Sequence, residues 1–133
     1  MDPVVTAQSL GRRFGHRWAV ARLNLEVDRN ERLLIIGPNG CGKTTLLRMM
    51  ATLLPPSQGT LQWSGNDDDP RSVIGLMGPA PGIYEDLSAA DNLRVFARLA
   101  GRDRDDVPSI LTTVGLDGRS EPVSRYSAGT VSY

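Results

Sequence analysis

The chain has 133 residues, 40% of them apolar, and its 15 basic and 15 acidic residues give a formal charge of zero. This length suits one modest domain, and the balanced charge does not indicate nucleic acid as a partner. The densest apolar run, residues 32–37, is far shorter than the roughly 18–20 residues of a membrane helix. A single cysteine fits a reducing compartment, and the first residues lack the basic segment of a signal peptide.

Two strands joined by a charged connection are expected at the beginning of the chain. Residues 4–10 read as the first strand, and residues 11–18 form an arginine-rich and glycine-rich turn. Residues 19–27 alternate between apolar and polar side chains, which is typical of a half-buried strand. Its apolar face would carry Ala19, Ala21, Leu23, Leu25 and Val27.

The middle of the chain combines short apolar runs with turn signals. Residues 32–37 are continuously apolar after the first position and end in glycine, which predicts a strand covered on both faces. A helix is expected over 43–54, where two prolines stop it, and further strands over 60–65 and 72–77. The three aspartates at 67–69 precede a proline, and a solvated turn is favoured over a metal site.

The second half of the chain carries helical signals. Ser88 with Asp91 three residues later is a capping pattern, and apolar residues then recur at helical spacing through residue 100. These are Leu93, Phe96, Ala97 and Ala100. A second helix is expected over 106–116, with Pro108 near its start and Gly115 at its end.

The sequence GPNGCGKT at residues 37–44 matches G-x-x-x-x-G-K-[ST] between a predicted strand and a predicted helix. Glycines let the backbone wrap an anion with its N–H groups inward, and the helix start adds its positive dipole end. We therefore expect a nucleoside triphosphate here. The contacting residues would be Gly37, Pro38, Asn39, Gly40, Cys41, Gly42, Lys43, Thr44 and Thr45.

Two side chains of this loop have distinct expected roles. Lys43 is the only lysine beside fourteen arginines. Its compact ammonium can follow the β- and γ-phosphates, where a planar guanidinium would not pack. The hydroxyl of Thr44 can join the oxygen ligands of Mg²⁺.

Three further stretches accompany the loop: Phe14-Gly15, residues 73–93, and YSAGT at residues 126–130. Together they resemble the nucleotide-binding subunit of ABC (ATP-binding cassette) transporters over essentially the whole chain, closest to the haem-exporter and drug-exporter groups. The resemblance implies that Phe14 stacks on adenine, and that YSAGT is the signature motif acting on a partner subunit's γ-phosphate. The signature would comprise Tyr126, Ser127, Ala128, Gly129 and Thr130, the last replacing the family's glutamine.

The resemblance implies an α/β fold of the P-loop NTPase class (ABC ATPase type), present in part. Residues 1–77 would hold the N-terminal strands and P-loop core, and residues 78–133 a helical subdomain ending at the signature. The C-terminal half of the core would be absent. ATP and Mg²⁺ are the implied cofactors, and membrane subunits and a second ATP-binding subunit the implied partners. The location would be cytoplasmic, peripheral on the cytoplasmic face of the cell membrane.

Two departures from the family pattern concern catalysis. Pro79 occupies the place of a glutamine that reaches Mg²⁺ and the attacking water, and proline offers no ligand. No Walker B aspartate, general base or switch histidine follows the signature, and His16 lies too far upstream. No catalytic residue is therefore identified, and we expect a truncated form.

Two alternatives stay open at this point. The chain could bind nucleotide without hydrolysing it, which the missing carboxylates favour. It could also be a small P-loop phosphotransferase, which would require an arginine-rich lid. The sequence GRDRDD at 101–106 offers two arginines, but a solvated connection between helices is the favoured interpretation.

Overall fold

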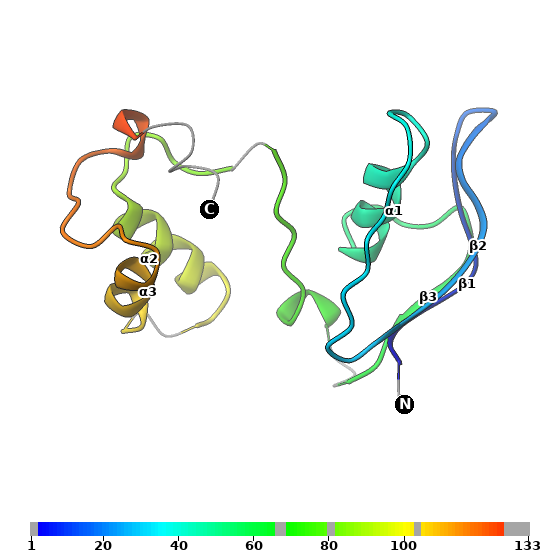
Figure 1. The fold of residues 1–133 in the computed structure, drawn as a ribbon, viewed down its shortest axis with the longest axis horizontal. Coiled ribbons are helices and arrows are strands. Elements are labelled where there is room, and N and C mark those ends of the chain that lie inside the picture. Colours follow the sequence, from blue (N-terminus) through cyan, green and yellow to red (C-terminus); the bar gives the residue numbers. More distant parts are fainter. Residues whose placement is uncertain (1–2, 66–68, 80–81, 103–104, 127–133) are drawn as a thin grey trace. The chain divides into compact units, whose positions relative to one another are not determined.

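The computed structural model describes residues 3–65, 69–79, 82–102 and 105–126. The chain divides into two compact units, Met1–Leu76 and Met77–Tyr133, and each is described by itself (Figure 1). The division lies next to the boundary that the sequence places near Gly78. Within the described ranges, no helix is both long and apolar enough to cross a bilayer.

A three-stranded antiparallel sheet forms the framework of the first unit. It comprises β1 (Pro3–Phe14), β2 (Arg17–Asp28) and β3 (Gln58–Trp63) in the order β2-β1-β3. Figure 1 shows the long β1–β2 hairpin with β3 along it. The strands predicted over 4–10, 19–27 and 60–65 are confirmed in kind, although β3 ends at Trp63. The turn predicted over 11–18 is wrong for most of its length, because the two strands stay paired as far as Phe14 and Arg17.

The alternation predicted for the second strand holds over only part of β2. Leu23, Leu25 and Val27 are half-buried, with exposed polar residues between them. At Arg22 the backbone takes a positive φ of 51°, and the β1–β2 register shifts nearby. Beyond this irregularity Val20 packs against the core instead of Ala21, which is exposed. The expected apolar face was therefore wrong at Ala21, because an irregular residue changes which side chains share a face.

The helix α1 (Lys43–Met50) packs against the sheet and completes the core of the first unit. Leu10 is fully buried and Met49 is 1% exposed. The helix ends four residues before the predicted residue 54, because Thr52 takes a positive φ of 62° that a right-handed helix excludes. The buried residues of this core are Ala7, Leu10, Leu46 and Met49.

Two predicted strands, 32–37 and 72–77, are not strands in the structure. Leu34 is 79% exposed, Ile36 82% and Val73 79%. A strand requires a neighbour for its backbone hydrogen bonds, and the sheet of the described residues pairs only β1, β2 and β3. Apolar composition alone therefore did not produce a strand at either segment.

The second unit is helical, as predicted. It contains α2 (Ala89–Leu99), α3 (Val107–Thr113) and the short 3₁₀ helix η2 (Val123–Arg125). The backbone N–H of Asp91 donates to the Ser88 hydroxyl at 3.1 Å, so the capping prediction is confirmed. Of the apolar series expected on α2, Phe96 and Ala100 are exposed. The buried core consists of Ala89, Val107, Leu111 and Val123.

Candidate functional site

The glycine-rich loop joins the extended segment before it to the start of α1. Gly40 and Gly42 take positive φ values of 81° and 106°, and Gly42 is the residue that caps α1. A Cβ atom built on Gly42 would lie 2.1 Å from the carbonyl oxygen of Ala19 in β2. Gly42 thus meets two independent requirements for glycine, a left-handed backbone and close approach to another strand.

Lys43 is the first residue of α1, and its ammonium turns back onto the loop. Its Nζ donates hydrogen bonds to the carbonyl oxygens of Gly37 at 2.5 Å and Pro38 at 2.8 Å. The same nitrogen lies 3.7 Å from the exposed Sγ of Cys41. These contacts tie the Lys43 ammonium to the first residues of its own loop.

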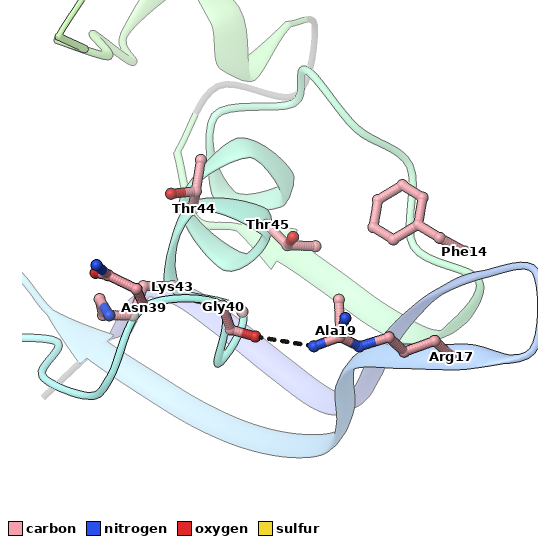
Figure 2. Close-up of a pocket in the computed structure, with 9 residues that line it drawn as sticks. Phe14, Arg17, Ala19, Asn39, Gly40, Lys43, Thr44 and Thr45 are labelled. Carbon is pink, nitrogen blue, oxygen red and sulfur yellow. Dashed lines mark hydrogen bonds between the residues drawn. The ribbon is translucent and has the colours of Figure 1, made fainter.

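A cavity of about 410 Å³ lies between the loop and the β1–β2 hairpin (Figure 2). Phe14, at the end of β1, reaches it because the hairpin turns at Gly15, where φ is 59°. The Phe14 ring is 52% exposed, and the Arg12 guanidinium carbon lies 5.0 Å from its centroid. The lining residues are Phe14, Arg17, Ala19, Asn39, Gly40, Gly42, Lys43, Thr44 and Thr45.

The structure therefore brings together two features that are 23 residues or more apart in sequence, the aromatic ring and the glycine-rich loop. Of the predicted contact residues, Gly37, Pro38 and Cys41 are not among the lining residues, but each contacts the Lys43 ammonium. His16 is exposed in the hairpin turn.

Sequence reasoning missed Arg17 and Ala19, which also line the cavity. The Nη2 atom of Arg17 donates to the carbonyl oxygen of Gly40 at 3.5 Å, and Figure 2 shows its side chain extending toward the loop. The available signal was the hairpin itself, because it places the first residues of β2 beside Phe14. The sequence had predicted only a charged turn over residues 11–18.

The candidate signature is only partly described. Tyr126 belongs to the second unit, where it packs on the core with the Arg119 guanidinium carbon 4.8 Å from its ring centroid. Its hydroxyl is buried without a hydrogen-bond partner among the described residues. Ser127, Ala128, Gly129 and Thr130 lie outside the described residues.

Carboxylates are absent from the described lining of the cavity. The described residues also contain no group of three His, Cys, Asp or Glu side chains that could hold a metal ion. Asp69 caps a short 3₁₀ helix (η1, Pro70–Ser72), and its hydrogen bonds from Arg71 lower the pKa of its carboxyl group. Asp67 and Asp68 lie outside the described residues. Thr44 is among the lining residues, as are Thr45 and Asn39, and its hydroxyl is an oxygen ligand of the kind that a hard cation prefers.

Comparison with solved structures identifies the fold. The chain superimposes on a structure described as the ATP-binding subunit of an ABC transporter, with a TM-score of 0.84 and 24% identity, over 97% of this chain and 58% of that one. A second match is CbiO1 from Clostridium perfringens, described as part of the ABC transporter complex CbiONQ. Its TM-score is 0.79 at 21% identity, over 99% of this chain and 59% of that one. The fold is thus that of P-loop ABC ATPase domains, present in part.

Sequence relatives agree with this fold. The chain is 38% identical over 131 residues to the cytochrome c biogenesis ATP-binding export protein CcmA 2 of Cupriavidus metallidurans, covering 93% of this chain and 62% of that protein. It is 36% identical over 138 residues to the daunorubicin resistance ATP-binding protein DrrA3 of Streptomyces coeruleorubidus, covering 96% and 44%. The chain therefore spans less than two thirds of the length of these relatives. The ABC transporter family model matches residues 20–133, and the chain therefore belongs to the ABC transporter family.

Proposed function

We propose that this chain binds Mg–ATP in the cavity between Phe14 and the glycine-rich loop, as the nucleotide-binding part of an ABC transporter subunit. The observation that carries the proposal is that this cavity combines the aromatic ring, the loop amides and the start of α1. The ring offers an apolar face to a base. The loop and helix start offer N–H groups and a positive dipole end to phosphates.

The Lys43 ammonium suits the phosphates of Mg–ATP, and the Thr44 hydroxyl suits its Mg²⁺ ion. The Lys43 ammonium donates hydrogen bonds to two carbonyl oxygens, and the oxygens of a bound phosphate can replace these carbonyls as stronger acceptors. The Thr44 hydroxyl is a suitable oxygen donor for Mg²⁺, which is commonly held by one or two protein ligands plus substrate phosphates. Bound Mg²⁺ would neutralise charge on the triphosphate.

Family membership supports the wider context of the proposal. ABC ATP-binding proteins work with membrane subunits, so we propose a location on the cytoplasmic face of the membrane and a second ATP-binding subunit as partner. Residues 126–130 would act there as the signature motif. The names of the relatives, an export protein for cytochrome c biogenesis and a daunorubicin resistance protein, favour an export-type system.

For the 133-residue chain alone we propose binding without turnover. Hydrolysis requires a group that orients or activates water, and no carboxylate lines the described part of the cavity. Pro79, at the expected glutamine position, is exposed and provides no side-chain ligand. The small phosphotransferase alternative is not supported, because the family match covers residues 20–133.

Calorimetric titration of the purified chain with Mg–ATP tests the proposal. Lys43→Ala should abolish binding, because it removes the cation and the two hydrogen bonds that shape the loop. Arg48→Ala, in the last turn of the same helix, removes the same charge and serves as the control that should bind normally. Binding that survives Lys43→Ala would overturn the site assignment. Phosphate release above background in wild type would overturn the proposed lack of turnover.

A further inference from the structure

Arg17 occupies a position in the cavity that the assigned roles leave unused. It is the first residue of β2, three residues after Phe14, and its guanidinium extends into the space between the hairpin and the loop (Figure 2). Its recorded partner is the carbonyl oxygen of Gly40, 3.5 Å from Nη2. This distance is beyond the usual range of roughly 2.7–3.2 Å for such bonds, so the contact is weak.

Among the described residues, Arg17 has no ion pair with a carboxylate. Ion pairs elsewhere in the described residues include those of Arg71 with Asp69, Arg94 with Asp91 and Arg119 with Glu121. The other cation lining the cavity, Lys43, already donates to the Gly37 and Pro38 carbonyl oxygens. Arg17 is therefore a charged group with an exchangeable partner, facing a cavity whose other end is built for anions.

The order of the lining elements indicates which part of a nucleotide Arg17 would meet. Phe14 lies on the hairpin side, and the start of α1 with Lys43 lies on the loop side. Arg17 belongs to the hairpin but reaches toward Gly40 of the loop, and so bridges the two sides. In a nucleoside triphosphate, the α-phosphate joins the nucleoside to the β- and γ-phosphates.

We propose that Arg17 is a further nucleotide-binding residue, which exchanges the Gly40 carbonyl for the α-phosphate of a bound nucleotide. This inference rests on the proposed function of the cavity. A guanidinium can donate two parallel hydrogen bonds to two oxygens of one phosphate. The Gly40 carbonyl has a single, uncharged oxygen and is therefore the weaker acceptor. Because ATP and ADP both carry the α-phosphate, Arg17 strengthens the binding of both. Its contribution to the affinity does not depend on the γ-phosphate.

The test is titration of the 133-residue chain with Mg–ATP and Mg–ADP, comparing wild type with Arg17→Gln. We expect both affinities to fall by about tenfold, which corresponds to the loss of roughly one charge-assisted hydrogen bond. The slope of log affinity against log salt should also become shallower, since one phosphate contact is lost. Arg17→Lys should recover part of the affinity, because it keeps the charge without the fork.

Arg13→Gln is the matched control. Arg13 lies in the same hairpin, and its substitution removes the same charge. Its guanidinium carbon lies 5.9 Å from the Trp18 ring centroid, and Arg13 does not line the cavity. It should bind both nucleotides as wild type does. Circular dichroism checks that each variant is folded.

The possible failures are distinguishable. If wild type binds neither nucleotide, the proposed function itself fails. If wild type binds and Arg17→Gln leaves both affinities unchanged, or weakens ATP but not ADP, the α-phosphate assignment is wrong. An equal loss in Arg13→Gln would also overturn it, because the effect would then come from general charge.

Discussion

Each of the two compact units buries a small apolar core, but the units leave apolar side chains exposed in different kinds of segment. In the second unit, the helices α2, α3 and η2 bury Ala89, Val107, Leu111 and Val123 against one another. In the first unit, α1 covers part of the sheet, while Leu34 and Ile36 of the segment before the loop stay largely exposed. The difference shows that short-range partners are found within each unit, whereas apolar segments without a neighbouring strand stay uncovered.

The two units also differ in where their loops find hydrogen bonds. In the second unit, the buried side chain of Asn92 accepts from Tyr84 N–H and donates to the carbonyl oxygens of Tyr84, Leu87 and Ser88, which closes the loop before α2. In the first unit, the hydrogen bonds of the loop come from a half-buried cation, Lys43. The first arrangement stabilises a fold, and the second leaves groups available to a ligand.

The largest expected effect is on the core of the first unit. Leu10→Ala removes a fully buried side chain that packs with α1, and should lower the free energy of unfolding by about 3 kcal/mol. Hydrogen exchange followed by mass spectrometry should show the loss in residues 3–65, with protection of α2 and α3 retained. Equal loss of protection in both units would contradict the separation into two units.

A glycine substitution tests the site within the first unit. Gly42→Ala places a Cβ against the Ala19 carbonyl at a φ of 106°, and should cost about 1–3 kcal/mol and abolish Mg–ATP binding. Gly40→Ala also has a positive φ, but its Cβ would meet nothing within 4 Å. Titration calorimetry should therefore find weaker but measurable binding in Gly40→Ala. Normal binding by Gly42→Ala would show that the loop tolerates a shift away from β2.

The corresponding test of the second unit is Asn92→Ala. Asn92 is 5% exposed, and its loss removes a hydrogen-bond partner of the Tyr84 N–H and of the Tyr84, Leu87 and Ser88 carbonyl oxygens. We expect destabilisation by about 2 kcal/mol, seen as faster exchange in residues 82–102 and little change in the first unit. Arg98→Ala, on the exposed side of the same helix, is the control that should leave exchange unaltered.

A smaller effect is expected at the start of α2. Ser88→Ala removes the cap and should cost about 1 kcal/mol, measured by urea denaturation.

The Ser88 hydroxyl, and then Arg94, lower the pKa of Asp91 below 3.8. A lowered native pKa gives stability that is present above the unfolded value and is lost as pH falls through the native value. The Asp91→Asn variant should therefore be less stable than wild type at neutral pH, with the difference fading below pH 3.8.

The smallest effect concerns the uncovered segment. Leu34→Ser should change stability by less than about 0.5 kcal/mol, because this side chain is 79% exposed. Thermal denaturation of this variant beside Leu10→Ala compares a covered with an uncovered leucine of the same unit. A loss in Leu34→Ser as large as in Leu10→Ala would mean that the segment is packed in solution.

Local signals account for most of what could be predicted. The hairpin strands, the cap at Ser88 and the position of Pro108 near the start of α3 depend on residues close together in the chain, so pattern and chemistry sufficed. The segments 32–37 and 72–77 were mispredicted, because a strand depends on a neighbour that its own sequence does not encode.

The sequence by itself was enough to locate the glycine-rich loop. The spacing of Gly37, Gly42 and Lys43 predicts a backbone that can come close to an anion, with one ammonium beside it. The tertiary structure alone decided that Phe14 and Arg17 share a cavity with that loop, and that Gly42 must pass beside the Ala19 carbonyl. The physical reason is that backbone conformation is set largely by neighbouring residues. Which side chains meet across a cavity depends instead on how the hairpin packs against α1.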